Sequence, residues 1–460
     1  MNETVRSPHG RTLLHRITTR AARVGVVGLG YAGLPLAVAF GRAGFTVLGV
    51  DTDPVKCRTI NGGGSDIPDV SDREVAGLVA VGRLSAVAAL EGSEPLDTVN
   101  ICVPTPLRKT RDPDLSHVIA ATRAVKEHLR PGMLVILEST TYPGTTEEVV
   151  RAILEETGLL AGEDFFLAFS PERVDPGNTT WTTQNVPKVV GGLTADCSAL
   201  ASALYRSCID QVVAVSSPRT AEMVKLLENT FRAVNIGMVN EMALMCDRIG
   251  VDVWEVIDAA ATKPFGFMPF YPGPGLGGHC IPVDPYYLSW KVREVGFEAR
   301  FIDLAGQTNA AMPHHVVDKI ADALNQDGKA LRGSRVLLMG IAYKPEVGDV
   351  RESPALDVLA LLLKKGAVVS YHDPFVPSIT VQLPSGGATL TSEPCTRELL
   401  ATADCVVVLT DHSAFDYTEL VAAAKLIVDT RNAVRTTAPH VVKLGAPNAG
   451  RTTASRDAVF

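Results

Sequence analysis

The feature that most constrains the fold is a glycine-rich turn between a short strand and a helix. The run RVGVVGLGYAGLPLAVAF starts with a β-branched segment, passes through Gly28, Gly30 and Gly33, and continues as an apolar stretch with helical character. A second apolar strand, TVLGV, follows and is closed by Asp51. This strand–turn–helix–strand order is that of a dinucleotide-binding unit. A doubly wound α/β domain is therefore predicted near the start of the chain.

The residues of this turn have physical reasons to contact a dinucleotide. Gly28 permits the tight turn, Gly30 lets the backbone approach a pyrophosphate, and Gly33 lets helix and strand pack closely. Asp51 is placed to accept hydrogen bonds from an adenosine ribose, and its charge would repel the extra phosphate of NADP. The alternative is a glycine-rich turn of some other α/β fold. We predict that NAD is the cofactor, held by Gly28, Gly30, Tyr31, Ala32, Gly33 and Asp51.

Composition and charge exclude several classes of protein. The 460 residues are 46% hydrophobic, which is enough for the cores of two or three domains. The net charge of -8 argues against nucleic acid as a partner, because phosphate binding needs a basic face. No apolar run approaches the roughly twenty residues that span a bilayer, and the arginine-containing start is unlike a signal peptide. A cytoplasmic protein without a membrane partner is expected.

The cysteines give no sign of a metal site. All eight are scattered singly, and none forms a Cys-x-x-Cys pair. Neither a zinc site nor a disulfide framework is indicated by such spacing. No metal is therefore expected.

A long helix is predicted to start at the pair Ser217-Pro218, a capping residue followed by proline. From there to Gly250, apolar residues recur at helical spacing, and many of them are methionine or leucine. At about 1.5 Å per residue this helix would be roughly 45 Å long, more than one small domain needs. It is expected to join two domains and to present the surface of a homodimer.

The C-terminal part of the chain has the pattern of a second α/β unit. Strands in SRVLLMGIAYKP, AVVSYHDP, ADCVVVLTDH and KLIVDTRN end in polar residues, and a helix is predicted over Pro354–Lys365. Strands separated by helices indicate a parallel sheet. With NAD in the first unit, a substrate nucleotide is expected in the second. The predicted fold is α/β, with two Rossmann-like doubly wound parallel-sheet domains joined by a long central helix.

Five segments are predicted from this pattern. They are a flexible N-terminal tail (1–21), an NAD-binding Rossmann domain (22–205), a central helical, dimerisation and catalytic-loop region (206–325), a C-terminal Rossmann-like domain for the nucleotide substrate (326–445), and a flexible C-terminal tail (446–460).

The stretch GPGLGGHCIPVDP places Cys280 in a loop of glycine and proline. The simplest interpretation is a buried loop thiol. However, a loop between two nucleotide-binding halves is where ligand sites occur, and NAD enzymes use a thiolate when an aldehyde must be oxidised. The thiol adds to the carbonyl, and the adduct gives up a hydride to leave a thioester for hydrolysis. Lys225 and Asp284 are of the right types to stabilise an oxyanion and to activate water.

Ordered motifs make the chain resemble a known family. GLGYAGLPLA, VPTP, EST, SPER, AEMVKLLENTFRAVNIGMVNE, GPGLGGHCIPVDP and AYKPEVGDVRESPAL follow one another between about Ala22 and Asn432. This pattern is similar to that of the nucleotide-sugar 6-dehydrogenases, which act on UDP-glucose, UDP-N-acetylglucosamine, UDP-N-acetylmannosamine or GDP-mannose. The resemblance is closest to the UDP-N-acetylglucosamine branch.

The resemblance implies roles for individual residues. Cys280 would be the nucleophile, while Lys225 and Asn229 would hold the oxyanion and orient the sugar. Asp284 and Thr140 would position a catalytic water, and Glu172 would assist thioester hydrolysis. Further implied cofactor contacts are Thr105, Thr140 and Arg351, and the implied substrate-binding set is Glu172, Arg173, Lys225, Asn229, Phe270, Tyr271, Gly273, Gly277 and Lys344.

One departure from the pattern bears on the sugar. Glucose-specific members carry a second glutamate where this chain has Pro176, and the adjacent Asp175 is not an evident replacement. Their cross-subunit arginine ahead of the cysteine loop also lacks a clear match, since that segment offers only Lys263.

The expected activity is an NAD-dependent four-electron oxidation of the hexose 6-hydroxyl to the uronic acid, on UDP-N-acetylglucosamine or UDP-glucose. Alternatives are the same reaction on TDP-glucose or UDP-N-acetylmannosamine, an NAD-retaining epimerase or dehydratase, and a catalytically silent nucleotide-sugar sensor.

The pair Tyr287 and Lys291 has the spacing found in short-chain dehydrogenases, but it comes too late in the chain for that fold. His314 and His315 follow Pro313 and are read as a helix start rather than a metal site.

Overall fold

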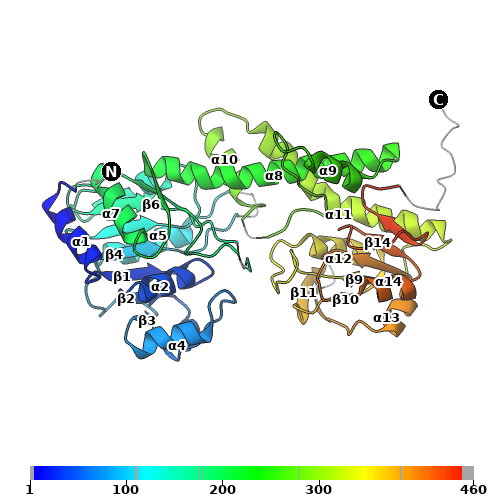
Figure 1. Cartoon of the computed structure of the whole chain (residues 1–460), viewed down its shortest axis with the longest axis horizontal. Helices are drawn as coiled ribbons and strands as arrows, with labels where there is room; N and C mark the ends of the chain where they lie inside the picture. The colour runs from blue at the N-terminus through cyan, green and yellow to red at the C-terminus, as the bar shows by residue number, and fades with distance from the viewer. Residues whose placement is uncertain are drawn as a thin grey trace. The chain divides into compact units, whose positions relative to one another are not determined.

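The computed structural model describes residues 5–108, 112–175, 177–178, 180–278, 280–383 and 386–447. The chain forms two compact units, and each is an α/β structure (Figure 1). The first unit runs to Glu228 and also includes Tyr286–Glu298. The second contains Asn229–Pro285 and the chain from Ala299 onward. The predicted fold class, with two Rossmann-like units and a long helix, is confirmed.

The first unit is built on an eight-stranded sheet in the order β3-β2-β1-β4-β5-β6-β7-β8. The central strands β4, β5 and β6 are buried along their whole length, and β5 and β6 are wholly apolar, as expected for a sheet covered on both faces. The strands are β1 (Arg23–Val27), β2 (Thr46–Val50), β3 (Leu84–Val87), β4 (Thr98–Ile101), β5 (Leu134–Leu137), β6 (Phe166–Phe169), β7 (Lys188–Gly192) and β8 (Val212–Val215).

Helices cover the two faces of this sheet and enclose one hydrophobic cluster on each. Residues of α1, α2 and α7 pack in one cluster, and residues of α5 and α6 pack in the other. The helices of this unit before the long one are α1 (Pro8–Thr18), α2 (Gly33–Arg42), α3 (Pro54–Asn61), α4 (Asp72–Ala80), α5 (Ser116–Lys126), the π-helix η1 (Thr146–Val150), α6 (Arg151–Glu155) and α7 (Ala195–Tyr205).

The sheet differs from the prediction in two respects. Strand β7 pairs antiparallel with β6, so the sheet is mixed rather than wholly parallel. Strand β8 pairs with β7, so the sheet extends beyond the predicted domain boundary at residue 205. Strands β7 and β8 are parallel to each other and are joined by α7, but both run antiparallel to β6. The direction was not predicted, because the periodicity of apolar residues does not indicate which way a strand runs.

The predicted flexible tail over residues 1–21 is wrong for the part that the structure describes. Helix α1 begins with Ser7, whose side chain accepts from the Gly10 N–H, followed by Pro8. Leu13 and Ile17, one turn apart, are buried in the core of the unit. Ser-Pro at the start and apolar residues at a spacing of four form an amphipathic helix, which the surrounding arginines obscured in the sequence.

Helix α8 (Pro218–Ile249) confirms the predicted long helix, and the division between the two units falls within it. The later helices are α9 (Val253–Ala261), α10 (Asp284–Arg293) and α11 (Arg300–Gln326). Pro313 lies inside α11, so the expected helix start at His314 is wrong, and His315 instead pairs with Asp247 at 3.0 Å. Among the described helices, none is long and apolar enough to cross a membrane.

The second unit has a five-stranded parallel sheet in the order β10-β9-β13-β14-β15, as its strand–helix alternation predicted. An antiparallel hairpin, which the sequence did not indicate, forms a separate two-stranded sheet in this unit. The elements are β9 (Arg335–Met339), α12 (Pro354–Lys365), β10 (Val368–His372), β11 (Ser378–Leu383), β12 (Gly386–Thr391), α13 (Arg397–Thr402), β13 (Cys405–Val408), α14 (Tyr417–Ala423), β14 (Ile427–Asp429) and β15 (Val441–Lys443).

The end of the chain is ordered slightly further than expected. Leu444 and Ala446 are buried, and the Leu444 carbonyl accepts from the indole N–H of Trp254 at 2.8 Å. The remainder of the predicted tail, from residue 448 on, lies outside the described residues.

Candidate functional site

The turn between β1 and α2 has the shape that the glycine pattern predicts. Gly28 adopts a φ of 93°, and a side chain on Gly33 would place its Cβ 1.8 Å from the Gly28 carbonyl oxygen. A Cβ on Gly30, in contrast, would meet no atom within 4 Å. The backbone over Gly30 is thus open to a close-fitting ligand, which fits the pyrophosphate of a dinucleotide. Tyr31 and Ala32 complete the turn, and Tyr31 is exposed.

Asp51 stands at the carboxyl end of β2 beside this turn. One carboxylate oxygen accepts from the Leu29 N–H at 3.0 Å, and the other from the Asp53 N–H at 3.0 Å. The Lys56 ammonium lies 3.3 Å from the carboxylate. The glycine turn and the acidic residue predicted to hold NAD therefore lie together.

Two other predicted cofactor contacts follow neighbouring strands of the same sheet. Thr105 comes after β4, and its carbonyl accepts from the Tyr287 hydroxyl at 2.9 Å. This hydrogen bond gives Tyr287, which is fully buried, a structural role. Thr140 comes shortly after β5 and is half-buried. Arg351 belongs to the second unit, where it forms an ion pair with Asp349 at 2.6 Å.

Glu172 is held by a buried cluster of charges in the first unit. One of its carboxylate oxygens lies 3.0 Å from the Lys188 ammonium, and the other accepts from the Arg173 and Val174 N–H groups at 2.7 and 2.8 Å. Lys188 also donates to Glu138 at 2.7 Å. The second Glu138 oxygen accepts from Asn100 and from the Tyr205 hydroxyl, each at 2.7 Å.

This cluster fixes the charge of Glu172. Burial favours the neutral acid, but the Lys188 ammonium and the backbone N–H donors lower the pKa of Glu172. Burial likewise opposes the charge of Lys188, but the two carboxylates raise the pKa of its ammonium. Glu172 is therefore a fixed carboxylate, which suits hydrogen-bond acceptance and charge stabilisation better than proton uptake.

Sequence reasoning missed Lys188 and Glu138. Each is a charged residue in or directly beside a strand that is otherwise apolar, in VPKVV and in LVILEST. A buried charge must be paired, so two such residues on nearby strands could have been read as a pair.

Lys225, on the part of α8 that belongs to the first unit, points to the same turn. Its ammonium donates to the Glu172 carbonyl at 2.6 Å. Glu222, one turn earlier, accepts from the Gly144 N–H at 2.5 Å and from the Thr146 N–H at 2.9 Å, and its burial raises the pKa of its carboxyl to about 7. The start of α8 is thereby tied to both loops that carry Thr140 and Glu172.

Arg173, a predicted substrate contact, forms hydrogen bonds within the first unit. Its guanidinium donates to Glu228 at 2.6 Å and to the Pro187 carbonyl at 2.6 Å. Through these bonds, Arg173 joins α8 to the segment before β7.

Cys280 lies in a turn of the second unit and is half-buried. Its carbonyl accepts from the Val283 and Asp284 N–H groups at 3.0 and 2.8 Å, and this turn leads into α10. Asp284 is buried and accepts from the Asn229 side-chain amide. Two of the predicted catalytic residues, Asn229 and Asp284, are thus brought together close to the Cys280 backbone.

The glycines before Cys280 allow its loop to pack closely. A Cβ on Gly277 would lie 2.9 Å from the Tyr343 side chain and 2.9 Å from the Glu352 carbonyl oxygen. The Gly278 N–H donates to the Arg351 carbonyl at 3.3 Å. The loop therefore lies directly on the segment that carries Lys344, whose ammonium is 5.7 Å from the Tyr343 ring.

The remaining predicted substrate contacts lie in the segment that leads to this loop. Phe270 packs edge-on against Phe231, and the Tyr271 hydroxyl donates to Asp258 at 2.8 Å. The Gly273 N–H donates to the Asn240 side chain at 3.0 Å.

Arg431, which the prediction did not include, comes within 2.6 Å of the position that a Gly273 Cβ would take. It follows β14 in the run DTRN. Its place at the end of a predicted strand could have marked it as a candidate contact residue. Pro176 and His279, the residue before Cys280, lie outside the described residues.

A dinucleotide turn on one α/β unit and a cysteine loop on a second, nucleotide-binding type of unit define an NAD-dependent nucleotide-sugar dehydrogenase. Comparison with protein families agrees. Models of the UDP-glucose/GDP-mannose dehydrogenase family match the NAD binding domain at residues 22–209, the central domain at 219–311 and the UDP binding domain at 337–436. The chain belongs to this family.

Relatives cover most of the chain. The UDP-N-acetyl-D-mannosamine dehydrogenase of Pyrococcus horikoshii is 35% identical over 90% of this chain and 96% of its own length. The UDP-N-acetyl-D-glucosamine 6-dehydrogenase of Pseudomonas aeruginosa is 37% identical over 77% of this chain and 83% of its own. The solved structure of the Pyrococcus horikoshii enzyme has a TM-score of 0.84, with 33% identity over 93% of this chain and 100% of that one.

Asp51→Ala is predicted to weaken NAD binding by about 1.5 to 3 kcal/mol, because charge-assisted hydrogen bonds to the ribose are lost. Calorimetric titration of the purified protein with NAD would measure the change. Asp53→Ala, which removes a carboxylate that caps α3 two residues away, is the matched control and should bind NAD normally. An unchanged affinity in Asp51→Ala would place the adenosine elsewhere.

Proposed function

We propose that this protein oxidises the 6-hydroxyl of a UDP-linked N-acetylhexosamine to the uronic acid, through a thioester on Cys280. The observation that carries the proposal is the Cys280 turn, which ends in Asp284 and its Asn229 partner. The names of the relatives support the sugar, since several are dehydrogenases of UDP-N-acetyl-D-mannosamine and one acts on UDP-N-acetyl-D-glucosamine. Pro176, in place of the glutamate of glucose-specific members, supports the same choice.

The Gly28–Gly33 turn and Asp51 would hold NAD, which would supply the hydride acceptor; a four-electron oxidation would need two NAD for each sugar. The first oxidation turns the alcohol into an aldehyde. The Cys280 thiolate then adds to the aldehyde carbon, and its electron pair forms the C–S bond while the carbonyl electrons move to oxygen. The second oxidation removes hydride from this adduct and leaves the thioester, which water cleaves to the acid and the thiol.

The chain's own residues have separate tasks in this scheme. The Lys225 ammonium stabilises the oxyanion that forms when the thiolate adds and again when water attacks. Asn229, one helical turn from Lys225 on α8, orients the sugar, and the Asp284–Asn229 pair with Thr140 positions the water. Glu172, held ionised by Lys188, assists as an acceptor that orients the water rather than as a strong base.

Nucleotide sugars tested side by side would decide the substrate. We expect UDP-N-acetylglucosamine or UDP-N-acetylmannosamine to give the highest kcat/KM, with two NADH formed per sugar. UDP-glucose and TDP-glucose are the comparison compounds. A preference for either glucose nucleotide would make the sugar assignment wrong, and sugar conversion without net NADH would indicate an NAD-retaining epimerase or dehydratase instead.

Cys280→Ser is predicted to abolish formation of the acid while NAD and the nucleotide sugar still bind, because serine is a poor nucleophile without a strong adjacent base. NADH yield per sugar and mass spectrometry of the intact protein would follow the reaction. Cys395→Ser, at an exposed cysteine, is the matched control and should retain full activity. Two NADH per sugar from the Cys280→Ser protein would disprove the thioester route.

A second copy of the chain is the proposed cover for the apolar face of α8. Exposed apolar side chains recur along this helix at intervals of three, four or seven residues, the spacing of a helix-packing stripe. Leu227 is 60% exposed and Ile249 is 71% exposed, and the other members are Met223, Phe231, Met238, Met242 and Met245. So large an apolar stripe is typical of an interface.

Sedimentation equilibrium at micromolar protein is expected to show a homodimer. Leu227→Glu should shift the protein towards monomer, because it places a charge in the stripe. Val295→Glu, at a position that is 80% exposed and outside α8, is the control and should remain dimeric. A wild-type monomer would contradict the proposal.

A further inference from the structure

The segment between β9 and α12, residues 341–353, supports the cysteine loop in the second unit. Its Arg351 carbonyl accepts from Gly278, and its Tyr343 side chain is the surface against which Gly277 and Gly278 pack. It also carries Lys344, which was predicted to contact the substrate. The conformation of this segment therefore sets the position of two parts of the proposed site.

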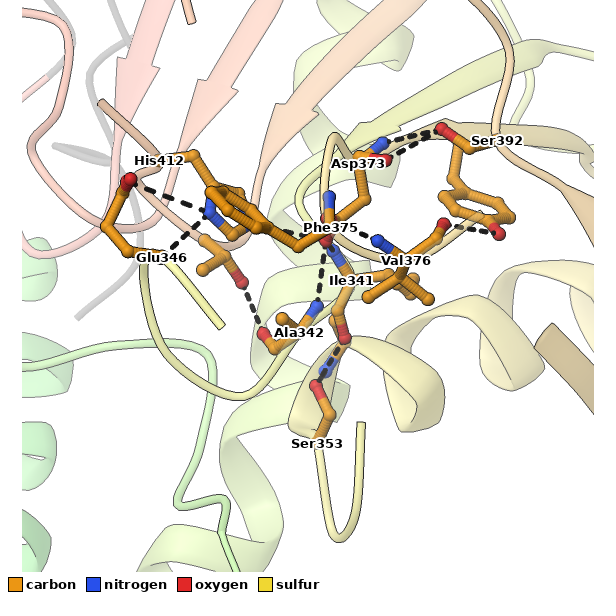
Figure 2. A network of polar contacts seen from close by, with 12 residues as sticks. Ile341, Ala342, Glu346, Ser353, Asp373, Phe375, Val376, Ser392 and His412 are labelled. Atoms are coloured by element: carbon orange, nitrogen blue, oxygen red, sulfur yellow. Dashed lines mark hydrogen bonds and ion pairs between the residues drawn. The ribbon is translucent and has the colours of Figure 1, made fainter. Parts of the chain in front are cut away.

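His412, which follows β13, holds this segment at Glu346 (Figure 2). The imidazole is fully buried, and its Nδ1 accepts from the Glu346 N–H at 3.1 Å. Next to it, the Ser413 N–H donates to the Glu346 carboxylate at 2.6 Å. Glu346 is thus held at its backbone by His412 and at its side chain by Ser413.

Asp373, at the end of β10, sets the orientation of the His412 ring. One of its oxygens lies 3.2 Å from His412 Nε2 and accepts from the Ile341 and Ala342 N–H groups at 2.7 and 3.1 Å. The other accepts from Phe375 and Val376 (Figure 2). Burial favours the neutral acid, but the bonds from His412 and the backbone lower the pKa of Asp373.

These contacts define the proton on His412. A backbone N–H can only donate, so Nδ1 must be the unprotonated acceptor for Glu346. An ionised carboxylate can only accept, so Nε2 carries the hydrogen. The ring is therefore the neutral tautomer that links a donor on one side to an acceptor on the other.

Glu346 needs this support. Its φ is 63°, in the left-handed region that a residue with a side chain rarely adopts. Such a conformation persists only where neighbouring contacts impose it. Thr410 and Ser353 fix the start of the segment through the Ala342 and Ile341 carbonyls, at 2.6 and 2.8 Å. At Glu346 itself, the holding contacts come from His412 and Ser413.

We propose that His412 is a positioning residue, which holds segment 341–353 through the Glu346 N–H and so keeps Lys344 and the cysteine loop in place for the nucleotide sugar. This inference rests on the proposed function. His412 is not assigned a contact with the substrate. It acts through the backbone of Glu346.

Two substitutions at His412 separate its two hydrogen bonds. In His412→Asn, the amide oxygen takes the place of Nδ1 and can still accept from Glu346, while the bond to Asp373 is lost. In His412→Gln, the longer amide can still donate to Asp373, while the Glu346 N–H loses its acceptor. The two variants differ only in which partner remains.

We expect His412→Gln to raise KM for the nucleotide sugar about tenfold or more, with KM for NAD within about twofold of wild type. His412→Asn should stay within about threefold for both substrates. Hydrogen exchange of residues 341–353, measured without substrate, should quicken in His412→Gln and not in His412→Asn. His440→Gln is the matched control, since the imidazole of His440, in the same unit, bonds to the Val421 carbonyl, outside segment 341–353, and it should behave as wild type.

Glu346→Ala provides a second route if His412→Gln does not fold. It removes the carboxylate that accepts from Ser413, at a side chain that is about half exposed, and it should also raise KM for the sugar selectively. Equal KM values and equal exchange in all variants would overturn the positioning role. Failure of the proposed function is distinguishable, because it would appear as absent NADH formation in the wild-type protein.

Discussion

The interaction on which the first unit depends is the burial of Lys188 between two carboxylates. Its ammonium lies 2.7 Å from Glu138 and 3.0 Å from Glu172, so one positive charge serves two negative ones in the interior. Removing one partner from a buried ion pair costs about 3 to 5 kcal/mol, because a charge is left unpaired. These three residues come from the ends of β5 and β6 and the start of β7, where the sheet reverses direction. The cluster thus joins the reversal of the sheet to the Glu172 turn.

Each unit stabilises a carboxylate near the end of a strand, and the two do so in different ways. Glu172 is stabilised chiefly by a lysine, whereas Asp373 is stabilised by four backbone N–H groups and an imidazole. Glu172 therefore has a charged neighbour 3.0 Å away. Both oxygens of Asp373 accept hydrogen bonds within the unit, and the bond from His412 fixes the ring that accepts from the Glu346 N–H. The ion pair with Lys188 fits the role proposed for Glu172 in thioester hydrolysis. The hydrogen bonds of Asp373 fit the positioning role proposed for His412.

Much of the fold was predictable, because its signals are local. The turn with Gly28 and Gly33, the strands and helix α12 have short-range patterns of apolarity, glycine and caps, and the structure confirms them. The direction of β7, the hairpin β11–β12 and Pro313 inside α11 were not predictable in this way. Strand direction and hairpin attachment depend on distant partners, and a helix can retain proline when packing on both sides compensates for the lost hydrogen bond.

The candidate site shows the same limit. Residue types and motifs singled out Cys280 in its glycine and proline loop, Asp284 four residues later, and Lys225 on the predicted long helix. The sequence could not show that Arg173 forms an ion pair with Glu228, because that contact depends on how α8 lies beside the segment before β7.

Lys188, Glu138 and His412 were missed for the converse reason. They lie inside apolar segments or directly beside them, and only their partners reveal why a charged or polar group is buried there. The residues proposed to act on the substrate were picked out by their type and by the motif that contains them. The groups that hold them in place are found where a polar residue interrupts a strand or stands at its end, and their role follows from the partner that the fold supplies.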